Sequence, residues 1–190
     1  MSGYYVEQAV KKNLMVWCFT NAPPAIAPYG AKKTLFGTNP ICFGTPSGGK
    51  VPFILDSSVS MINRGIIRVA ARLGKKIPAG VALDKNGKPT IDAKKALKGV
   101  QLPIAGFRGP QNVGHLFLAI KPNIFIGKNY IKRIKENIRI IKKLPRAKGF
   151  ASISYPGENK AKRFSHNSKK KINLPKEIKK DLDKLISASS

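Results

Sequence analysis

The stretch TLFGTNPICFGTPSGGKVPFILDSSVS, residues 34–60, decides the fold. It contains two short apolar runs, Ile41 to Phe43 and Val51 to Leu55, and each ends at small or polar residues. The segment 46–49 between them, Pro-Ser-Gly-Gly, has the composition of a turn, because glycine tolerates positive φ and proline fixes φ. An apolar run of this length between turn residues favours a buried strand over a helix. The stretch therefore predicts two strands separated by a turn.

Three polar residues, Asp56, Ser57 and Ser58, follow the second strand in a chain with only nine acidic residues against 36 Lys and Arg. Ser57 and Ser58 also open a helical pattern, which predicts a helix from Ser58 to Leu73. Asp56 and Ser57 are therefore expected first as helix caps. The alternative is a polar ledge where the ribose or phosphate of a ligand binds. Neither common nucleotide loop, G-x-G-x-x-G after a strand or G-x-x-x-x-G-K-[ST], is present.

Composition is that of a folded protein. A chain of 190 residues with 42% hydrophobic residues can build one core, so residues 1–190 are expected to form a single domain. Cys18 and Cys42 lie in apolar surroundings without metal-ligand spacing, which favours buried free thiols, no metal site and a reducing, cytoplasmic setting. No apolar run approaches the length that spans a bilayer, and no signal-peptide pattern is present. The sequence predicts a soluble cytoplasmic protein.

The charge of the chain is extreme, with a formal net charge of +27 and a sequence pI of about 10.4. Such a charge attracts nucleic acid nonspecifically, so a basic nucleic-acid-binding protein is a second hypothesis. Lysine outnumbers arginine, however, whereas specific readers of bases and phosphates rely on the two-pronged arginine side chain. No RNA-binding aromatic motif is present. Nucleic-acid binding therefore remains the alternative function.

Periodicity and turn residues predict the other elements. Asp84 and Asp92 flank an Asn-Gly turn and precede a short helix, so turn and cap roles are expected for them. Residues 160–171 are expected to form a mobile basic loop. The fold class is predicted as α/β, a mixed sheet covered by helices. The predicted elements are helices at 3–10, 93–98 and 128–144, strands at 14–19, 150–155 and from His115, and a last helix from Pro175 with Ile178, Leu182 and Leu185 inward.

The segments GTNPICFGTP (37–46), VPFILDSSVS (51–60) and IPAGVALDKNGKPTIDAKKALKGVQLPIAGFRG (77–109) resemble the malate/L-lactate dehydrogenase family. This family includes ureidoglycolate and sulfolactate dehydrogenases and is unrelated to the Rossmann-type enzymes. Its pattern of G-T-N-P, L-D-x-x-x-S, I-P-x-G-x-x-x-D-x-x-G-x-x-T-x-D and L-P-x-x-G-[YF]-K-G is met nearly throughout, in order. The resemblance implies an NAD- or NADP-dependent oxidoreductase of 2-hydroxy and 2-oxo acids that forms homodimers. It makes 14–126 the nucleotide-binding sheet region and leaves 127–190 as an amphipathic helix, a strand and a C-terminal helix.

The same resemblance implies cofactor contacts at eight positions. Ala22 offers only its backbone, and Arg108 stands where the family has lysine, which keeps the charge but changes its geometry. Each position also has an ordinary structural interpretation, such as a loop between strands for Ala22, an exposed loop arginine for Arg108 or surface pairing with lysines for Glu158. The eight positions are Ala22, Asp56, Ser57, Ser58, Arg108, Pro156, Gly157 and Glu158.

No catalytic residue is assigned. In the family, an N-S-x-H-F-G motif supplies the histidine that exchanges a proton with the substrate, and this chain starts just downstream of the matching position. The segment between Gly109 and His115 is also shorter than in the family, and His115 is interpreted as structural. The expectation is a chain truncated at the N-terminus and internally shortened, with impaired activity or as a degenerate cofactor binder. The impairment is expected because a positioned proton donor, here the family histidine, typically accounts for about 10² to 10⁴ in reaction rate.

Overall fold

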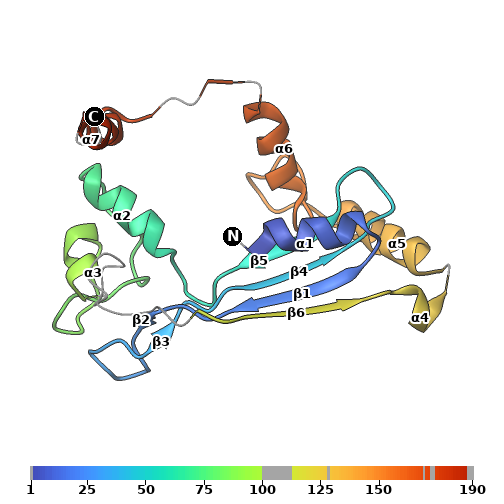
Figure 1. Cartoon of the computed structure of the whole chain (residues 1–190), viewed down its shortest axis with the longest axis horizontal. Coiled ribbons are helices and arrows are strands. Elements are labelled where there is room, and N and C mark those ends of the chain that lie inside the picture. The colour runs from blue at the N-terminus through green and yellow to red at the C-terminus, as the bar shows by residue number, and fades with distance from the viewer. Residues whose placement is uncertain (1, 100–112, 128, 169, 172–173, 188–190) are drawn as a thin grey trace. The chain divides into compact units, whose positions relative to one another are not determined.

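The computed structural model describes residues 2–99, 113–127, 129–168, 170–171 and 174–187 (Figure 1). Their contacts divide the chain into two compact units, which are described one at a time. The single domain expected over 1–190 stays a prediction. Unit 1 comprises Met1–Ala22, Asn39–Val59 and Gln111–His166, and unit 2 comprises Pro23–Thr38, Ser60–Pro110 and Asn167–Ser190.

Unit 1 is built on a four-stranded sheet in the order β5-β4-β1-β6. The α/β class is confirmed. Where a mixed sheet was predicted, every described strand pair of this sheet is antiparallel, unlike the mostly parallel sheet of the Rossmann fold. The register places Cys18 opposite Cys42, and Cys42 opposite Asp56. The strands are β1 Met15–Thr20, β4 Ile41–Thr45, β5 Phe53–Ser57 and β6 His115–Ile120.

Helix α1, Ser2–Lys11, covers one face of this sheet (Figure 1). Val6 and Val10 of the helix form a buried cluster with Val16, Cys18 and Cys42. Val16 and Cys18 share a face because side chains alternate along a strand. Both cysteines are buried free thiols, as predicted. Burial, with the Asp56 charge as a second cause, raises the pKa of Cys42 to about 12, so its thiol is inert at neutral pH.

The remaining helices of unit 1 correct two predictions. Helix α5 confirms the amphipathic helix expected at 128–144. The basic loop expected at 160–171 is wrong for most of its length, because α6 occupies it. Glu158 starts α6 and pairs with Lys162 one turn later, which favours the helix despite its many lysines. These helices are α4 Asn123–Ile126, α5 Asn129–Lys143 and α6 Glu158–Asn167.

The strand predicted at 150–155 is also wrong. This segment contains one bend and otherwise irregular backbone, and two of its carbonyl groups accept hydrogen bonds from side chains and not from a neighbouring strand. Lys142 Nζ donates to the carbonyl of Ile153 at 2.8 Å, and Arg146 donates to that of Ala151 at 2.9 Å. The alternation of the sequence was real, but two basic side chains compete with strand pairing.

Unit 2 pairs a two-stranded sheet with small helices. Its buried cluster contains Ile67, Ala71, Ile77, Ala93 and Ala96, so three of its five members are alanines. The two leucines expected to point inward from the last helix, Leu182 and Leu185, are 41% and 65% exposed, which contradicts that prediction. The elements are β2 Pro24–Ile26, β3 Phe36–Gly37, α2 Arg64–Arg72, α3 Ala93–Gly99 and α7 Lys176–Ser187.

The start of α2 differs from the prediction as well. The helix begins at Arg64, six residues after Ser58, so Asp56 and Ser57 do not cap it. Ser60 Oγ donates to the carbonyl of Ile62, a local bond that competes with helical backbone. None of the helices in the described part of the chain has the length and apolar character to cross a membrane.

Two aspartates of unit 2 have the turn and cap roles that were predicted. The Asp84 carboxylate accepts the backbone N–H groups of Asn86 and Lys88 at 2.8 and 3.0 Å, which closes the Asn-Gly turn. Asp92 accepts those of Lys94 and Lys95 at 2.8 and 3.0 Å at the start of α3. These backbone hydrogen bonds are the main cause that lowers the pKa of both carboxyl groups.

Candidate functional site

Asp56 lies in an open depression of unit 1, between the end of β5 and the segment before and within α6. The depression has a volume of about 420 Å³. It brings Asp56 together with Pro156 and Gly157, which are far away in the sequence and were predicted to contact the same cofactor. Its lining residues are Ile54, Leu55, Asp56, Ser154, Tyr155, Pro156, Gly157, Asn159 and Lys160.

The Asp56 carboxylate is held from two sides. Its Oδ2 atom accepts the backbone N–H of Gly3, at the start of α1, at 3.1 Å. The same oxygen lies 3.6 Å from Lys160 Nζ of α6, and the Asp56 side chain is 22% exposed. Gly3 permits the approach of α1, since a Cβ there would lie 2.6 Å from Oδ2. Both contacts of the carboxylate in the described structure use Oδ2, which leaves Oδ1 able to accept a hydrogen bond from a ligand.

The side of the depression opposite Asp56 is a wall formed by residues 154–157. Backbone and ring contacts hold this wall against β5. The Ile54 N–H donates to the carbonyl of Pro156 at 3.2 Å. The Tyr155 hydroxyl donates to the carbonyl of Val51 at 3.1 Å, and its ring stacks on that of Phe53 with centroids 6.3 Å apart. Burial raises the pKa of Tyr155, with the charge of Glu158 as a second cause, so the hydroxyl stays a neutral donor. The wall is therefore a fixed part of the sheet edge.

Gly157 is required at its position in this wall. Its φ is +94°, and a Cβ would lie 3.0 Å from the carbonyl oxygen of Pro52 and 3.1 Å from the nitrogen of Ile54. Both the positive φ and the close approach to β5 exclude a side chain. The glycine of the predicted Pro-Gly-Glu turn thus has a firm structural role.

Glu158 sits beside the depression and contacts two lysines. Its carboxylate pairs with Lys142 of α5 and, at 3.2 Å, with Lys162 of α6, and its side chain is 14% exposed. The hydrogen bond from Lys142 is the main cause that lowers the pKa of Glu158. Pairing with neighbouring lysines was the structural interpretation given to this residue, and the contacts match it.

Three further predicted positions, Ser57, Ser58 and Ala22, are not among the residues that line the depression. The Ser57 hydroxyl donates to the carbonyl of Ser58 at 3.1 Å, a contact within the chain segment itself. Neither serine lines the depression, and nor does Ala22, whose N–H donates to Asn39 Oδ1 at 3.0 Å. Arg108 lies outside the residues that the structure describes.

Sequence reasoning missed three polar lining residues: Ser154, Asn159 and Lys160. Lys160 was counted as part of a basic loop, although it follows the Pro-Gly-Glu turn by two residues. Ser154 Oγ donates to Asn159 Oδ1 at 2.9 Å, so these two side chains support each other across the start of α6. Recognising that a helix starts at Glu158 would have put Lys160 in its first turn, next to the predicted Pro-Gly-Glu contacts.

A family model described as malate/L-lactate dehydrogenase matches residues 1–110. This match covers more than half of the chain, and the antiparallel sheet agrees with a fold other than the Rossmann fold. The chain therefore belongs to the malate/L-lactate dehydrogenase family.

Among its relatives is the L-sulfolactate dehydrogenase of Methanocaldococcus jannaschii, 38% identical over 198 residues, with 86% of this chain and 57% of that protein covered. The Delta(1)-pyrroline-2-carboxylate reductase of Ancylobacter novellus is 43% identical over 104 residues, which cover 55% of this chain and 30% of that protein. The solved structure of the Methanocaldococcus jannaschii sulfolactate dehydrogenase superposes with a TM-score of 0.77 and 35% identity, covering 93% of this chain and 59% of that one.

A malate dehydrogenase structure from Entamoeba histolytica has a TM-score of 0.84 at 21% identity, and it covers 98% of this chain and 64% of that one. At that identity the likeness concerns the fold alone. The chain spans 57% of the length of its sulfolactate dehydrogenase relative.

Proposed function

We propose that this chain supplies part of a dinucleotide site for NAD(P)-dependent interconversion of 2-hydroxy and 2-oxo acids. The observation that carries the proposal is the meeting of Asp56 with Pro156 and Gly157 in one depression. Family membership gives the class of chemistry, because the relatives named above are dehydrogenases and reductases. The bound nicotinamide would supply the hydride.

The residues of the depression fit part of such a cofactor. A carboxylate oxygen accepts hydrogen bonds from ribose hydroxyls, and this is the role proposed for Asp56 Oδ1. Lys160 has a 64% exposed side chain, and its exposed ion pair with Asp56 contributes little, so its ammonium group can turn to a phosphate. The depression does not choose between NAD and NADP. The homodimer, the cytoplasmic setting and the 2-hydroxy or 2-oxo acid partner remain parts of the proposal.

The decisive experiment is a titration of the full chain with NADH and with NADPH, followed by the fluorescence of the reduced nicotinamide. Asp56→Asn keeps the size of the side chain but removes its charge, and we expect the Kd to rise about tenfold or more. Asp84→Asn is the matched control, because that carboxylate closes a turn in unit 2 and asparagine also suits the turn. Equal binding by the wild type and Asp56→Asn would contradict the proposed site.

A second measurement separates binding from turnover and from the alternative function. Oxidation of NADH in the presence of pyruvate or oxaloacetate reports activity, whereas binding without oxidation is the outcome for a non-catalytic cofactor binder. Nucleic-acid binding, suggested by the net charge of +27, predicts duplex DNA affinity that falls steeply with added salt and does not respond to NADH.

A further inference from the structure

Unit 1 has a shallow basic groove at one end of its four-stranded sheet. The groove consists of two adjoining depressions of about 580 and 450 Å³, which share Ile131 of α5 as a lining residue. It lies where β1 begins and where β4 and β6 end, beside α4 and α5 (Figure 1). Its cations among the described residues are Lys12, Lys121, Lys132, Lys135 and Arg139.

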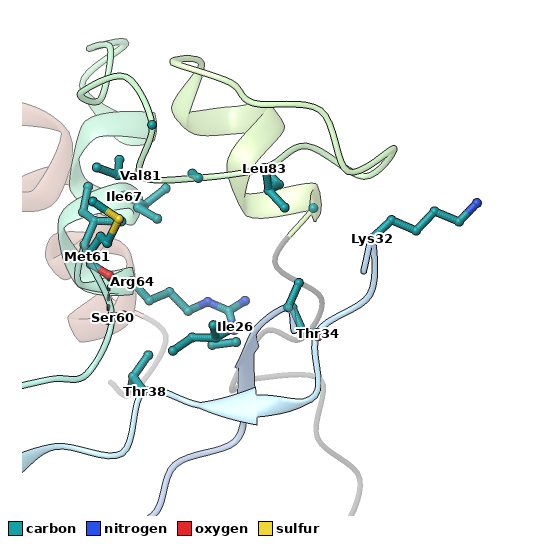
Figure 2. A pocket seen from close by; sticks show the side chains of 16 residues that line it. Ile26, Lys32, Thr34, Thr38, Ser60, Met61, Arg64, Ile67, Val81 and Leu83 are labelled. Atoms are coloured by element: carbon teal, nitrogen blue, oxygen red, sulfur yellow. Dashed lines mark hydrogen bonds between the residues drawn. The ribbon is translucent and has the colours of Figure 1, made fainter. Parts of the chain in front are cut away.

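The cavity of unit 2 has a different character. Its volume is about 230 Å³, and apolar side chains such as Ile26, Val81 and Leu83 make up most of its wall (Figure 2). Lys32 belongs to the lining, but its side chain points away from the cavity (Figure 2). The basic groove of unit 1 is open to an extended anion, whereas this smaller and mostly apolar cavity is not.

The floor of the groove is fixed to the sheet. Tyr130, near the start of α5, is buried, and its hydroxyl hydrogen-bonds with the hydroxyl of Thr45 at the end of β4. The turn at 46–49 touches the same helix, because a Cβ on Gly48 would lie 2.5 Å from Lys135 Cε. The cations of α5 therefore stand on a packed part of unit 1 and not on a free helix.

Little negative charge lies among these cations. Four lysines of the groove are exposed and take part in no ion pair within the described part of the chain: Lys12, Lys121, Lys132 and Lys135. Glu136 is the acid of the described lining, and its carboxylate pairs with Arg139 at 2.6 Å. The three cations of α5 follow one another at spacings of three and four residues, so they form a stripe about 10 Å long on one side of the helix.

This arrangement matches the backbone of a double-stranded nucleic acid. A row of cations is complementary to the regular phosphates of such a backbone. Single strands are usually held by stacking their bases on exposed aromatic rings, but Tyr130, the aromatic residue of the described lining, is buried. A duplex keeps its bases stacked inside and offers its phosphates on the outside. Lysine as the main cation suits contacts with phosphates that do not read the sequence.

An anionic lipid surface is the rival partner, because Ile124 and Phe125 of α4 are 73% and 68% exposed. A helix that lies on a membrane buries its apolar face in the lipid. The apolar face of α5, with Ile131, Ile134 and Ile138, is at most partly exposed, and the cations occupy the open face. The duplex is therefore the better match for this surface.

From these observations we propose that the basic groove of unit 1 binds the phosphate backbone of a duplex nucleic acid without reading its sequence. The proposal assigns the attraction expected from the net charge of +27 to a particular face of the protein. It is independent of the proposed cofactor site, because Asp56 pairs with Cys42 near the start of β4, toward the other end of the sheet. Duplex and NADH are therefore not expected to compete.

The test is fluorescence anisotropy of a labelled DNA duplex of about 20 base pairs, two helical turns, titrated with the full chain over a series of salt concentrations. The groove variant combines Lys121→Gln, Lys132→Gln and Lys135→Gln. We expect its Kd to rise at least about tenfold. The slope of log K against log salt should fall by about 3, since each lost phosphate contact removes about one released counterion.

The control variant removes the same number of charges elsewhere. It combines Lys85→Gln, Lys98→Gln and Lys176→Gln, three exposed lysines of unit 2, and its Kd should change by less than about threefold. Replacing the three groove lysines by arginine keeps the charges and should keep the binding, which guards against a folding defect in the groove variant. Circular dichroism checks that every variant is folded.

Equal weakening by the groove and control variants would overturn the proposal, because net charge alone would then account for the binding. Tighter binding of a single-stranded oligothymidylate of the same length would also overturn it. Displacement of the duplex by NADH would move the contact to the Asp56 depression. Binding to vesicles of equal parts phosphatidylserine and phosphatidylcholine, with no binding to the duplex, would make the groove a lipid-binding surface and refute the proposal.

Discussion

In unit 1 the Asp56 carboxylate contacts the ammonium group of Lys160 as well as the N–H of Gly3, and Glu158 contacts two lysines, whereas in unit 2 Asp84 and Asp92 accept hydrogen bonds from backbone N–H groups. A lysine side chain can leave its partner when a ligand arrives, but a backbone N–H of a closed turn cannot. Asp56 and Glu158 therefore have partners that a ligand can replace, whereas Asp84 and Asp92 have structural roles.

The buried clusters of the two units also differ in their residue composition. In unit 1, strands far apart in the sequence pair under a helix, and valines and cysteines fill the space between them. In unit 2 the cluster is largely alanine, so two short helices can approach closely but bury little apolar surface. We expect unit 1 to hold the more persistent structure.

The largest expected effect tests whether the two clusters are independent. Ile67→Ala should lower the free energy of unfolding of unit 2 by about 2–5 kcal/mol and speed hydrogen exchange in α2 and α3, while β1 and β4 stay protected. Val6→Ala removes fewer atoms and should lower the free energy of unfolding of unit 1 by about 1–3 kcal/mol. Hydrogen exchange should then speed up in β1 and β4, while α2 and α3 stay protected. Hydrogen exchange followed by mass spectrometry measures both. If either change exposes the amides of both units equally, the single cooperative domain expected from the sequence is correct.

The next effect compares one glycine from each unit. A Cβ on Gly44 would lie 2.3 Å from a methyl group of Val6, so Gly44→Ala should destabilise the protein by about 1–3 kcal/mol. Gly65, in the first turn of α2, has open space around the Cβ position, and Gly65→Ala should stabilise by about 0.5–1 kcal/mol. Denaturant unfolding measures both changes, and effects of the same sign would show that α1 does not rest on β4 as closely as described.

The sequence predicted the local structure well where one signal acts alone. The strands on either side of 46–49, the first helix and the Asn-Gly turn at Asp84 follow from apolar runs and turn chemistry. The failures occur where side chains compete with the backbone. Basic side chains withdraw carbonyl groups from 150–155, and the Ser60 hydroxyl delays the start of α2.

The candidate site could be predicted only in part, for a related reason. Resemblance could pair Asp56 with the Pro-Gly-Glu turn, but not with the N–H of Gly3 or the ammonium group of Lys160. Those contacts arise from the packing of α1 and α6, which single-chain periodicity does not encode.

The smallest expected effect returns to the carboxylates. The pKa of Glu158 is lowered mainly by the side chain of Lys142, whereas that of Asp84 is lowered mainly by the backbone N–H of Lys88. Lys142→Met should therefore raise the pKa of Glu158 toward the ordinary value of a glutamate carboxyl group. Lys88→Met, which keeps the N–H, should leave the pKa of Asp84 low. Carboxyl ¹³C signals followed through an acid titration measure both values.

The sign of the stability change follows from these directions. A carboxyl group with a depressed pKa in the folded state stabilises the protein above its unfolded pKa, and this contribution disappears as the pH falls through the folded pKa. Stability from Glu158 is thus complete above about pH 4.5 and lost below it, and Lys142→Met should flatten that part of the acid unfolding curve. Because the Lys142 and Lys162 side chains are partly exposed, 1 M salt should weaken the effect in unit 1. If salt weakened the contributions of Glu158 and Asp84 equally, the contrast between the two carboxylates would be wrong. Equal pKa shifts in Lys142→Met and Lys88→Met would contradict it as well.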